Sequence, residues 1–243
     1  MSADASFKDY FSDRSSLYAR YRPGYPQALF GELAALCRRH DLAWDCATGN
    51  GQAAVAIADH FKQVIATDAS AEQIASAIEA DAVDYRVAHA ESSGLDTASV
   101  DLVTVGQALH WFDRPRFFAE VERVLAAGGV LAAWCYELCH VDAACDAIVA
   151  ELYDNIVGEF WPPERRLIEE GYASIELPGE ALRVGEFAMS ANWTAADMLG
   201  YLRTWSACER YEKHYGEDPV ERTAGRLQAA CSRPATCSTG SSP

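Results

Sequence analysis

The sequence predicts an α/β protein with a Rossmann-like, doubly wound and mainly parallel sheet that carries helices on both faces. Short apolar segments alternate with amphipathic or alanine-rich segments from residue 41 to about residue 136. The first apolar segment runs directly into a glycine turn, and half of the 243 residues are hydrophobic, which is enough to fill a large core. Strands that alternate with helices at this spacing form parallel sheets.

The expected strands are short runs of apolar and β-branched residues bounded by turn residues. They lie at 42–46, 63–67, 83–87, 100–105 and 129–134. The expected helices alternate with them and lie at 29–39, 52–60, 71–80 and 114–125. In the last helix Phe117, Val121 and Val124 recur at helical spacing, which is typical of a face that packs on a sheet.

We expect one domain in four parts. An arm at 1–26 is helical and ends in an ordered aromatic loop, because Pro23 and Pro26 stop a helix. The core follows at about 27–137, and a lid with C-terminal elements occupies 138–231.

The pattern weakens beyond the core. We expect a helix at 141–157, a strand at 183–189 and a helix at 194–210. The last segment, 232–243, is rich in Ser, Thr, Pro, Gly and Cys and has no apolar period. It is expected to be flexible.

The charge balance limits the possible partners. The net charge is −16, from 36 acidic against 20 basic residues, and such a field repels nucleic acid. No apolar run approaches the roughly 18 residues that a membrane span needs, and the N-terminus lacks the pattern of a secretory signal. We therefore expect a cytoplasmic protein with a small-molecule partner, no nucleic acid and no membrane. The oligomeric state is left open.

Eight cysteines are spread along the chain without paired spacing. The nearest approach to a metal motif is Cys135, Cys139, His140 and Cys145, of which the first lies in an expected strand and the others lie beyond it. Convergence on one ion is not expected. We predict no metal site and reduced, mostly buried thiols.

A glycine loop follows the first expected strand. Gly49 and Gly51 let the backbone turn tightly and approach a ligand without an intervening Cβ atom. In a doubly wound sheet this loop lies at the carboxyl edge, where ligands bind. Asp68 ends the second expected strand, which suits a carboxylate that accepts hydrogen bonds from two ribose hydroxyls.

This pattern fits two cofactors. Gly49-x-Gly51-x-x-Ala54 followed by Asp68 also matches a loose NAD fingerprint, which would make the protein an oxidoreductase. Asp45, at the exit of the first expected strand, distinguishes between NAD and S-adenosylmethionine. A carboxylate there disfavours a pyrophosphate and favours the ammonium group of S-adenosylmethionine. The chain also lacks a recognisable later set of oxidoreductase catalytic residues.

The segment Asp45-Cys-Ala-Thr-Gly-Asn-Gly51 resembles the Asp-x-Gly-x-Gly-x-Gly loop of class I S-adenosylmethionine-dependent methyltransferases. Asp68 matches their ribose-binding acid, and Ala90-Glu91 is similar to the segment that borders the adenine. Gly106-Gln-Ala-Leu-His-Trp-Phe112 resembles the exit of their fourth strand, and Gly128-Gly129 the turn before the fifth. The resemblance implies that Ala47, Ala90, Glu91 and Gln107 also bind S-adenosyl-L-methionine.

The arm adds a narrower resemblance. Tyr21-Arg22-Pro23 and Tyr25-Pro26 are similar to the arm that closes over the methionine end in a subfamily related to trans-aconitate methyltransferase. The resemblance implies that Tyr18 and Arg22 contact the cofactor. It is strong over residues 7 to 135 and weaker to about residue 220.

The sequence departs from the family in two places. Ala47 stands where the first glycine is usual, and we expect it to keep a negative φ with a small adjustment of the loop. Members of the family also end with an antiparallel strand beside the fifth strand. Nothing after Glu209 reads as a convincing strand, so the fifth strand is expected to lack that neighbour.

His110 and Trp111 are the candidate catalytic residues, because they leave the fourth strand at the expected ligand edge. His110 could act as a base toward a hydroxyl or amine, or position a carboxylate that needs no base. Trp111, with Tyr18 or Tyr21, could stabilise a sulfonium through its aromatic face. Core packing is an equally good interpretation of both candidates. Trp161, Trp193, Tyr201 and Trp205 form an aromatic-rich lid or part of a core.

The sequence therefore predicts S-adenosylmethionine-dependent methyl transfer to a small molecule. A carboxylate acceptor is favoured only by the resemblance, through His110-Trp111 and the Arg22-Pro23 arm. The alternatives are a non-catalytic S-adenosylmethionine-binding protein and an NAD-dependent oxidoreductase.

Overall fold

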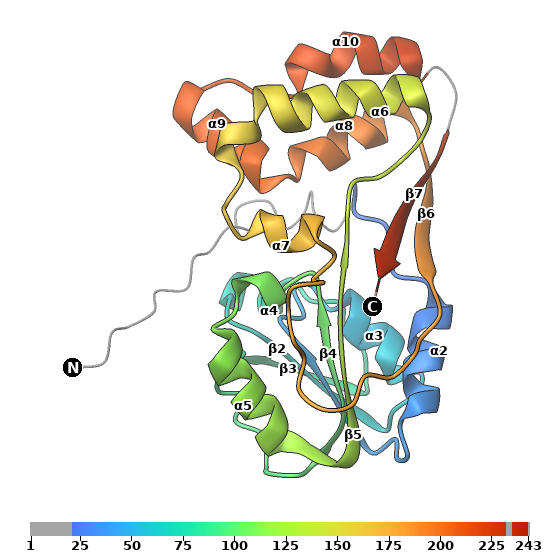
Figure 1. The fold of residues 1–243 in the computed structure, drawn as a ribbon, viewed down its shortest axis with the longest axis vertical. Helices are drawn as coiled ribbons and strands as arrows, with labels where there is room; N and C mark the ends of the chain where they lie inside the picture. The colour runs from blue at the N-terminus through green and yellow to red at the C-terminus, as the bar shows by residue number, and fades with distance from the viewer. Residues whose placement is uncertain (1–20, 232–234, 243) are drawn as a thin grey trace, which may run out of the picture. The chain divides into compact units, whose positions relative to one another are not determined.

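A computed structural model of the chain describes residues 21–231 and 235–242 (Figure 1). These residues form two compact units. The first unit comprises Phe30–Ala133, and the second comprises 21–29 together with the chain from Trp134 onward.

The first unit is built on a sheet in the order β3-β2-β1-β4-β5. β1 pairs in parallel with β2 and β4, and β2 pairs in parallel with β3. The order reverses between β1 and β4, which is the switch point at which doubly wound sheets bind ligands. The bounds are β1 Leu42–Cys46, β2 Gln63–Asp68, β3 Val83–Val87, β4 Val100–Gly106 and β5 Leu125–Tyr136.

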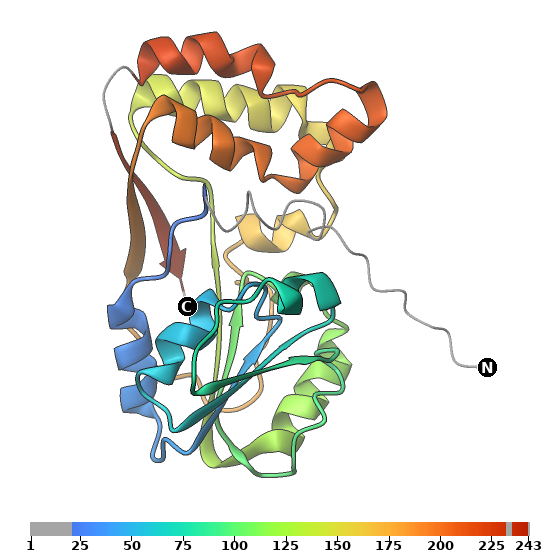
Figure 2. The same cartoon turned by 180° about the vertical axis from the view of Figure 1, so that it is seen from behind.

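Helices alternate with these strands as predicted. Figure 2 shows α3 and the main part of α2 on one side of the sheet, while α5 lies on the other. Local chemistry fixes the helix starts, because Ser70 caps α4 and Asp113 caps α5 with their side chains. The α/β, doubly wound fold class is confirmed. The bounds are α2 Gln27–Leu36, α3 Gln52–Ala58, α4 Ala71–Ala75, η2 Leu109–Trp111 and α5 Arg114–Val124.

The core of the first unit is built around aromatic and aliphatic side chains of the central strands. Trp44 of β1 is fully buried, and its indole N–H donates to the Thr67 hydroxyl over 2.8 Å. Its ring lies 6.2 Å from that of Phe117, on the predicted apolar face of α5. The strand ends are thereby held firmly where they meet the ligand edge.

The second unit is mainly helical. The predicted helix at 141–157 is present as α6, continued by the π-helix η3, and the one at 194–210 is divided into α8 and α9. The break follows Thr204, whose hydroxyl donates to the Tyr201 carbonyl. A further helix, α10, was not predicted. The bounds are α6 Ala143–Ala150, η3 Glu151–Ile156, η4 Gly158–Phe160, α7 Arg165–Glu169, α8 Ala195–Arg203, α9 Ser206–Tyr215 and α10 Glu221–Ala230.

The end of the chain corrects one prediction. Residues Ala235–Ser242 form β7, which pairs antiparallel with β6 (Phe187–Trp193) and with Cys135 and Tyr136 at the end of β5. The expectations of no strand after Glu209 and of a missing neighbour for the fifth strand are wrong. Backbone pairing with β6 and β5 supplies the hydrogen bonds, so the segment needs no apolar period of its own.

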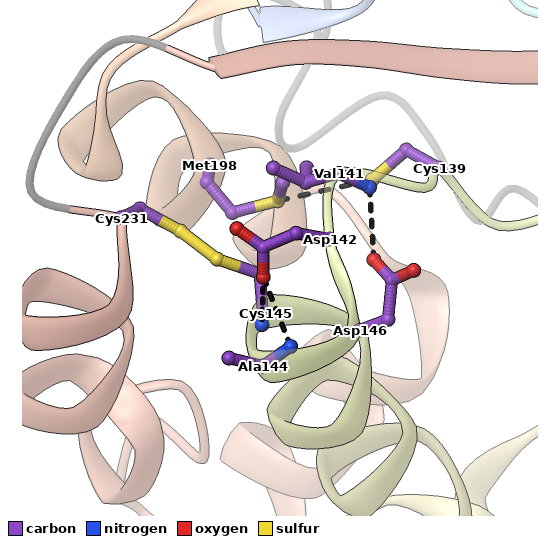
Figure 3. Close-up of a disulfide and its surroundings, with 8 residues drawn as sticks. All are labelled: Cys139, Val141, Asp142, Ala144, Cys145, Asp146, Met198 and Cys231. Carbon is purple, nitrogen blue, oxygen red and sulfur yellow. Dashed lines mark hydrogen bonds between the residues drawn. A yellow bond between two sulfur atoms is a disulfide. The ribbon is translucent and has the colours of Figure 1, made fainter.

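The prediction that all thiols are reduced is also corrected. Cys145 of α6 and Cys231, which follows α10, form a disulfide with their Cα atoms 6.6 Å apart (Figure 3). The two cysteines are 86 residues apart in sequence, so only the packing of α6 against α10 brings them together. Cys37, Cys46 and Cys135 are buried free thiols, and Cys139 and Cys208 are also buried. Because disulfides are rare in the cytoplasm, the cytoplasmic location stays a prediction.

The described residues contain neither a membrane-spanning helix nor a cluster of metal-ligating side chains. None of their helices is long and apolar enough to cross a membrane. Within the same ranges, no group of three or more His, Cys, Asp and Glu side chains is arranged to hold a metal ion.

Candidate functional site

The glycine loop between β1 and α3 makes a tight turn at the carboxyl edge of the sheet. The Thr48 N–H donates to the Thr67 carbonyl over 2.9 Å, which fastens the loop to β2. Ala47, Gly49 and Gly51 all have positive φ angles, at 54°, 57° and 89°. Such a loop turns its backbone toward the space above the strand ends, as a loop that binds a ligand through its main chain must.

Gly51 is the residue at which only glycine fits. A Cβ atom there would lie 2.2 Å from the Tyr85 hydroxyl oxygen. That hydroxyl is fixed in turn, because it donates to the Ile78 carbonyl over 2.7 Å. The Tyr85 side chain of β3 therefore lies directly against the loop.

Ala47 does not keep the negative φ that we expected. Its φ of 54° lies in the left-handed region, where an L-residue is disfavoured by about 1–2 kcal/mol. The next residue, Thr48, is fixed to β2 by its N–H, so Ala47 must complete the turn as a glycine would.

We expect Ala47→Gly to raise the free energy of unfolding by about 0.5–1 kcal/mol, because relief of the left-handed strain outweighs the greater entropy of glycine in the unfolded chain. Chemical denaturation measures this. The matched control is Ala147→Gly at an exposed position of α6, which should lower stability by up to about 1 kcal/mol. Equal losses in the two variants would contradict the prediction.

Asp45 is buried at the end of β1, with 1% of its surface exposed. Its two carboxylate oxygens accept hydrogen bonds from the hydroxyls of Thr48, at 2.6 Å, and Thr104, at 2.7 Å. Burial raises the pKa of Asp45 to about 6, and the nearby Asp68 carboxylate also raises it, while the two hydroxyls act in the opposite direction. This carboxylate links the loop to β4 and is a source of negative potential behind the loop.

The two threonines were not singled out by the sequence. A signal for Thr104 exists, because it is a polar residue between Val103 and Val105 near the end of β4. Thr48 lies within the glycine loop and carries no comparable signal.

Asp68 ends β2 and is largely buried. One carboxylate oxygen accepts the N–H of Gly49 and the other accepts the N–H of Ser70, both over 2.9 Å. A carboxylate at a strand end can accept hydrogen bonds from ribose hydroxyls. Asp68 therefore both anchors the glycine loop and can recognise a vicinal diol.

The segment after β3 is tied to Asp68 and to α5. The Ala88 N–H donates to the Asp68 carbonyl over 3.0 Å, and Ala90 behind it is buried. The Glu91 carboxylate accepts the N–H of Asp113, the capping residue of α5, over 3.0 Å. The predicted adenine-bordering residues thus lie next along the same edge.

The exit of β4 completes this edge. Gln107 has a φ of 57°, an uncommon conformation that clusters at functional sites. It leads into η2, where His110 is 5% exposed and its ring centroid lies 4.5 Å from that of the half-buried Trp111. The structure therefore places the predicted residues of the first unit, from Asp45 to Trp111, at the ends of β1 and β2 or on the segments that follow β1, β3 and β4.

The predicted arm residues lie in the other part of the chain. Tyr18 falls outside the described residues. Arg22 belongs to the second unit, where its guanidinium donates to the Tyr136 hydroxyl over 2.7 Å and to the Thr204 hydroxyl over 3.1 Å. It also lies 5.1 Å from the centroid of the Tyr201 ring. These contacts fix the end of the arm within the second unit.

The aromatic residues of the predicted lid form one row within the second unit. Trp193 contacts Tyr201, Tyr201 contacts Trp205, and Trp205 contacts Trp161, with ring centroids 5.0, 6.0 and 5.5 Å apart. Tyr201 and Trp205 are buried, as in a core, while Trp161 and Trp193 remain partly exposed. The core interpretation therefore holds for Tyr201 and Trp205, and the lid stays a prediction.

Comparison with known proteins agrees with this geometry. A family model described as a methyltransferase domain matches residues 44–133, which include the glycine loop, Asp68 and His110. A Dictyostelium discoideum protein assigned as a methyltransferase is 36% identical over 216 residues, which cover 87% of this chain and 82% of that protein.

Two further similarities extend the comparison. A solved structure from Anaeromyxobacter dehalogenans, assigned as a type II methyltransferase, is 39% identical and superposes with a TM-score of 0.84, covering 91% of this chain and 95% of its own. A Saccharomyces cerevisiae protein assigned as an S-adenosylmethionine-dependent methyltransferase is 30% identical over 132 residues, 50% of this chain and 45% of that protein. The chain belongs to the class I S-adenosylmethionine-dependent methyltransferases.

Proposed function

We propose that this enzyme transfers the methyl group of S-adenosylmethionine to a small-molecule acceptor, and that a carboxylate is the favoured acceptor group. The observation that carries the cofactor assignment is the arrangement of Asp68 and the glycine loop at the carboxyl edge of the sheet. The acceptor class rests on the resemblance of His110-Trp111 and of the Arg22-Pro23 arm to the subfamily related to trans-aconitate methyltransferase.

The chemistry of the acids tests the fit of the cofactor. Asp45 and Asp68 lie close enough that the charge of Asp68 raises the pKa of Asp45. Two neighbouring carboxylates repel a pyrophosphate but attract a cation, so this pair fits S-adenosylmethionine and argues against NAD. The diol of the ribose suits Asp68, and the ammonium group suits the negative potential of Asp45.

Each part of the site would bind a different part of the cofactor or of the acceptor. The backbone of the glycine loop would hold the methionine end, Asp68 the ribose and the Ala90-Glu91 segment the adenine. The bound cofactor supplies an activated methyl group on a sulfonium. His110 and Trp111 would orient the acceptor, and orientation can provide much of the rate in an in-line displacement.

Two measurements test the proposal. Calorimetry should show micromolar binding of S-adenosylmethionine and S-adenosylhomocysteine and none of NAD. Transfer of a labelled methyl group should then be followed across a panel of carboxylic acids, alcohols and amines. Tight NAD binding without binding of either thioether cofactor would refute the cofactor assignment. Binding without transfer to any acceptor would favour a non-catalytic role.

The raised pKa of Asp45 predicts a pH dependence of binding. Because the ammonium group is attracted to the ionised carboxylate, affinity for S-adenosylmethionine should rise with pH up to about 6 and level off above it. Below pH 6 the change should approach about tenfold per pH unit. Asp45→Asn should flatten this profile, as should 5′-methylthioadenosine, which lacks the ammonium group. A steep profile for that control would assign the effect to another residue.

The raised pKa of Asp45 affects folding stability in the opposite direction, so that stability falls as the pH rises. Asp45 binds its proton more tightly in the folded chain than in the unfolded chain, so its contribution to stability declines as pH rises from about 4 through 6. At neutral pH the ligand-free Asp45→Asn variant should therefore be no less stable than the wild type, while it binds the cofactor more weakly.

A further inference from the structure

A π-helix in the second unit creates an aromatic corner. In η3 the Val157 N–H donates to the Leu152 carbonyl, one residue further back than in an α-helix. The Tyr153 carbonyl instead accepts the indole N–H of Trp161 over 3.2 Å. The rings of Tyr153 and Trp161 lie 4.7 Å apart, and Trp205 supports both from the core.

The guanidinium of Arg165 lies over this corner. Its central carbon is 4.9 Å from the centroid of the Trp161 ring and 5.3 Å from that of Tyr153. Its Nε donates to the Tyr153 hydroxyl over 2.8 Å, and that hydroxyl donates in turn to Glu169. Burial raises the pKa of Tyr153 to about 12, so the hydroxyl keeps its proton at neutral pH. Arg165 is therefore held in one plane by its Nε and by two rings.

The two terminal nitrogens of the Arg165 guanidinium are unusual in this part of the chain. Over residues 21–231, no carboxylate lies within ion-pair distance of Arg165, and its two terminal nitrogens donate to no group. Three other arginines of the second unit each form an ion pair: Arg166 with Glu170, Arg203 with Asp218, and Arg226 with Glu151. The chain has 36 acidic against 20 basic residues, so carboxylates that could pair with an arginine are plentiful. Because none of them pairs with Arg165 in the described residues, its terminal N–H groups are available to a ligand.

The helix that carries Arg165 contacts the carboxyl end of β5. The carbonyl of Ile168, in the same short helix α7 as Arg165, lies 3.9 Å from the Cys135 thiol. Ile168 and Cys135 are both buried. Arg165 therefore lies near the carboxyl end of β5 within the second unit.

We propose that Arg165, together with Trp161 and Tyr153, binds a carboxylate of the methyl acceptor and so sets its specificity. The inference rests on the proposed methyl-transfer function. A planar guanidinium that offers two parallel N–H groups matches a carboxylate, and one positive charge in an acidic chain suits a monoanion better than a dianion. The partly exposed Trp161 would contact an apolar part of the same molecule.

The test uses phenylacetate as the probe and its neutral amide, phenylacetamide, as the reference. Both are titrated into the whole chain saturated with S-adenosylhomocysteine, and the indole N–H resonance of Trp161 is followed by NMR after assignment with Trp161→Phe. We expect phenylacetate to shift this resonance with at least tenfold higher affinity than phenylacetamide. Equal affinity for the two probes would overturn the proposal.

Variants then assign the effect to one guanidinium. Arg165→Gln should weaken phenylacetate binding about 10–100-fold, as expected for the loss of a charge-assisted pair. Arg166→Gln, which removes the neighbouring exposed charge, should leave it unchanged. Arg165→Lys keeps the charge and the stem but loses the fork, so it should be intermediate. Similar losses in Arg165→Gln and Arg166→Gln would indicate a general charge effect and refute the site.

The outcome is separable from that of the proposed function, because cofactor binding is measured on the same samples. If S-adenosylhomocysteine binds normally and phenylacetate shows no dependence on Arg165, only the subsite is wrong. If the cofactor does not bind the wild type, the proposed function fails. Should Arg165→Gln fail to bind S-adenosylhomocysteine through misfolding, the comparison of Arg165→Lys with the wild type decides the matter.

Discussion

Replacing Asp68 with alanine is expected to weaken binding of S-adenosylmethionine by a factor of about 10²–10³. The carboxylate would lose its charge-assisted hydrogen bonds to the ribose hydroxyls, which are together worth about 1.5–3 kcal/mol. The N–H groups of Gly49 and Ser70 would also lose their acceptor, and a buried donor without a partner costs about 1–3 kcal/mol. The loop would therefore be released at the same time as the ligand contact is lost.

Calorimetry on the wild type and on Asp68→Ala measures this effect. Asp59→Ala is a matched control, because Asp59 is an exposed acid that follows α3, and its removal should change affinity by less than about twofold. Asp68→Asn retains one acceptor oxygen and should lie between the wild type and Asp68→Ala. An unchanged affinity in Asp68→Ala would mean that the ribose is held elsewhere, and it would remove the main support for the cofactor site.

The parts of the fold that could be predicted are those fixed by local pattern. The strands β1 and β3 match the expected ranges, because a buried parallel strand is a short apolar run bounded by turn residues. The glycine loop and Asp68 could be predicted for a related reason. A tight turn needs glycine, and a ribose needs a carboxylate at a strand end, so both requirements act on residue type.

The features that could not be predicted depend on partners distant in sequence. β7 forms because β6 and the end of β5 offer backbone groups, and its own residues carry no apolar period. The left-handed φ of Ala47 follows from the hydrogen bond between Thr48 and Thr67, which joins two strands. The stacking of Arg165 depends on a π-helix, for which no sequence signal was available. In each case tertiary structure overrides the local preference.

The buried position of Asp45 changes how its role is understood. The sequence predicts only that a carboxylate at this position favours the ammonium group of the cofactor. Both of its oxygens accept threonine hydroxyls in the structure, one from the loop and one from β4. Its influence on a ligand is therefore expected to be through charge and through the shape of the loop, which is why pH and Asp45→Asn test it better than a contact-based argument does.

Replacing His110 with alanine is expected to lower kcat/KM for the acceptor by about 10²–10³, with cofactor affinity nearly unchanged. His110 is buried beside Trp111 in the turn after β4. Steady-state kinetics and calorimetry on the same preparation separate the two effects. If both acceptor and cofactor binding are lost in His110→Ala, the residue supports the structure of the turn and has no direct role.

The division of the effect between kcat and KM identifies the acceptor class. A carboxylate is already ionised at neutral pH, so it needs no base, and His110 would only position it. The loss in His110→Ala should then appear mainly in KM, and the wild-type rate should show no limb near pH 6–7. A hydroxyl or amine acceptor must lose a proton, so the loss should instead appear in kcat, and the wild-type rate should rise through the range in which histidines ordinarily titrate. Because the proposed function favours a carboxylate, we expect the first result. The second would retain methyl transfer but reassign the acceptor, and it would also remove the reason for a carboxylate to reach Arg165.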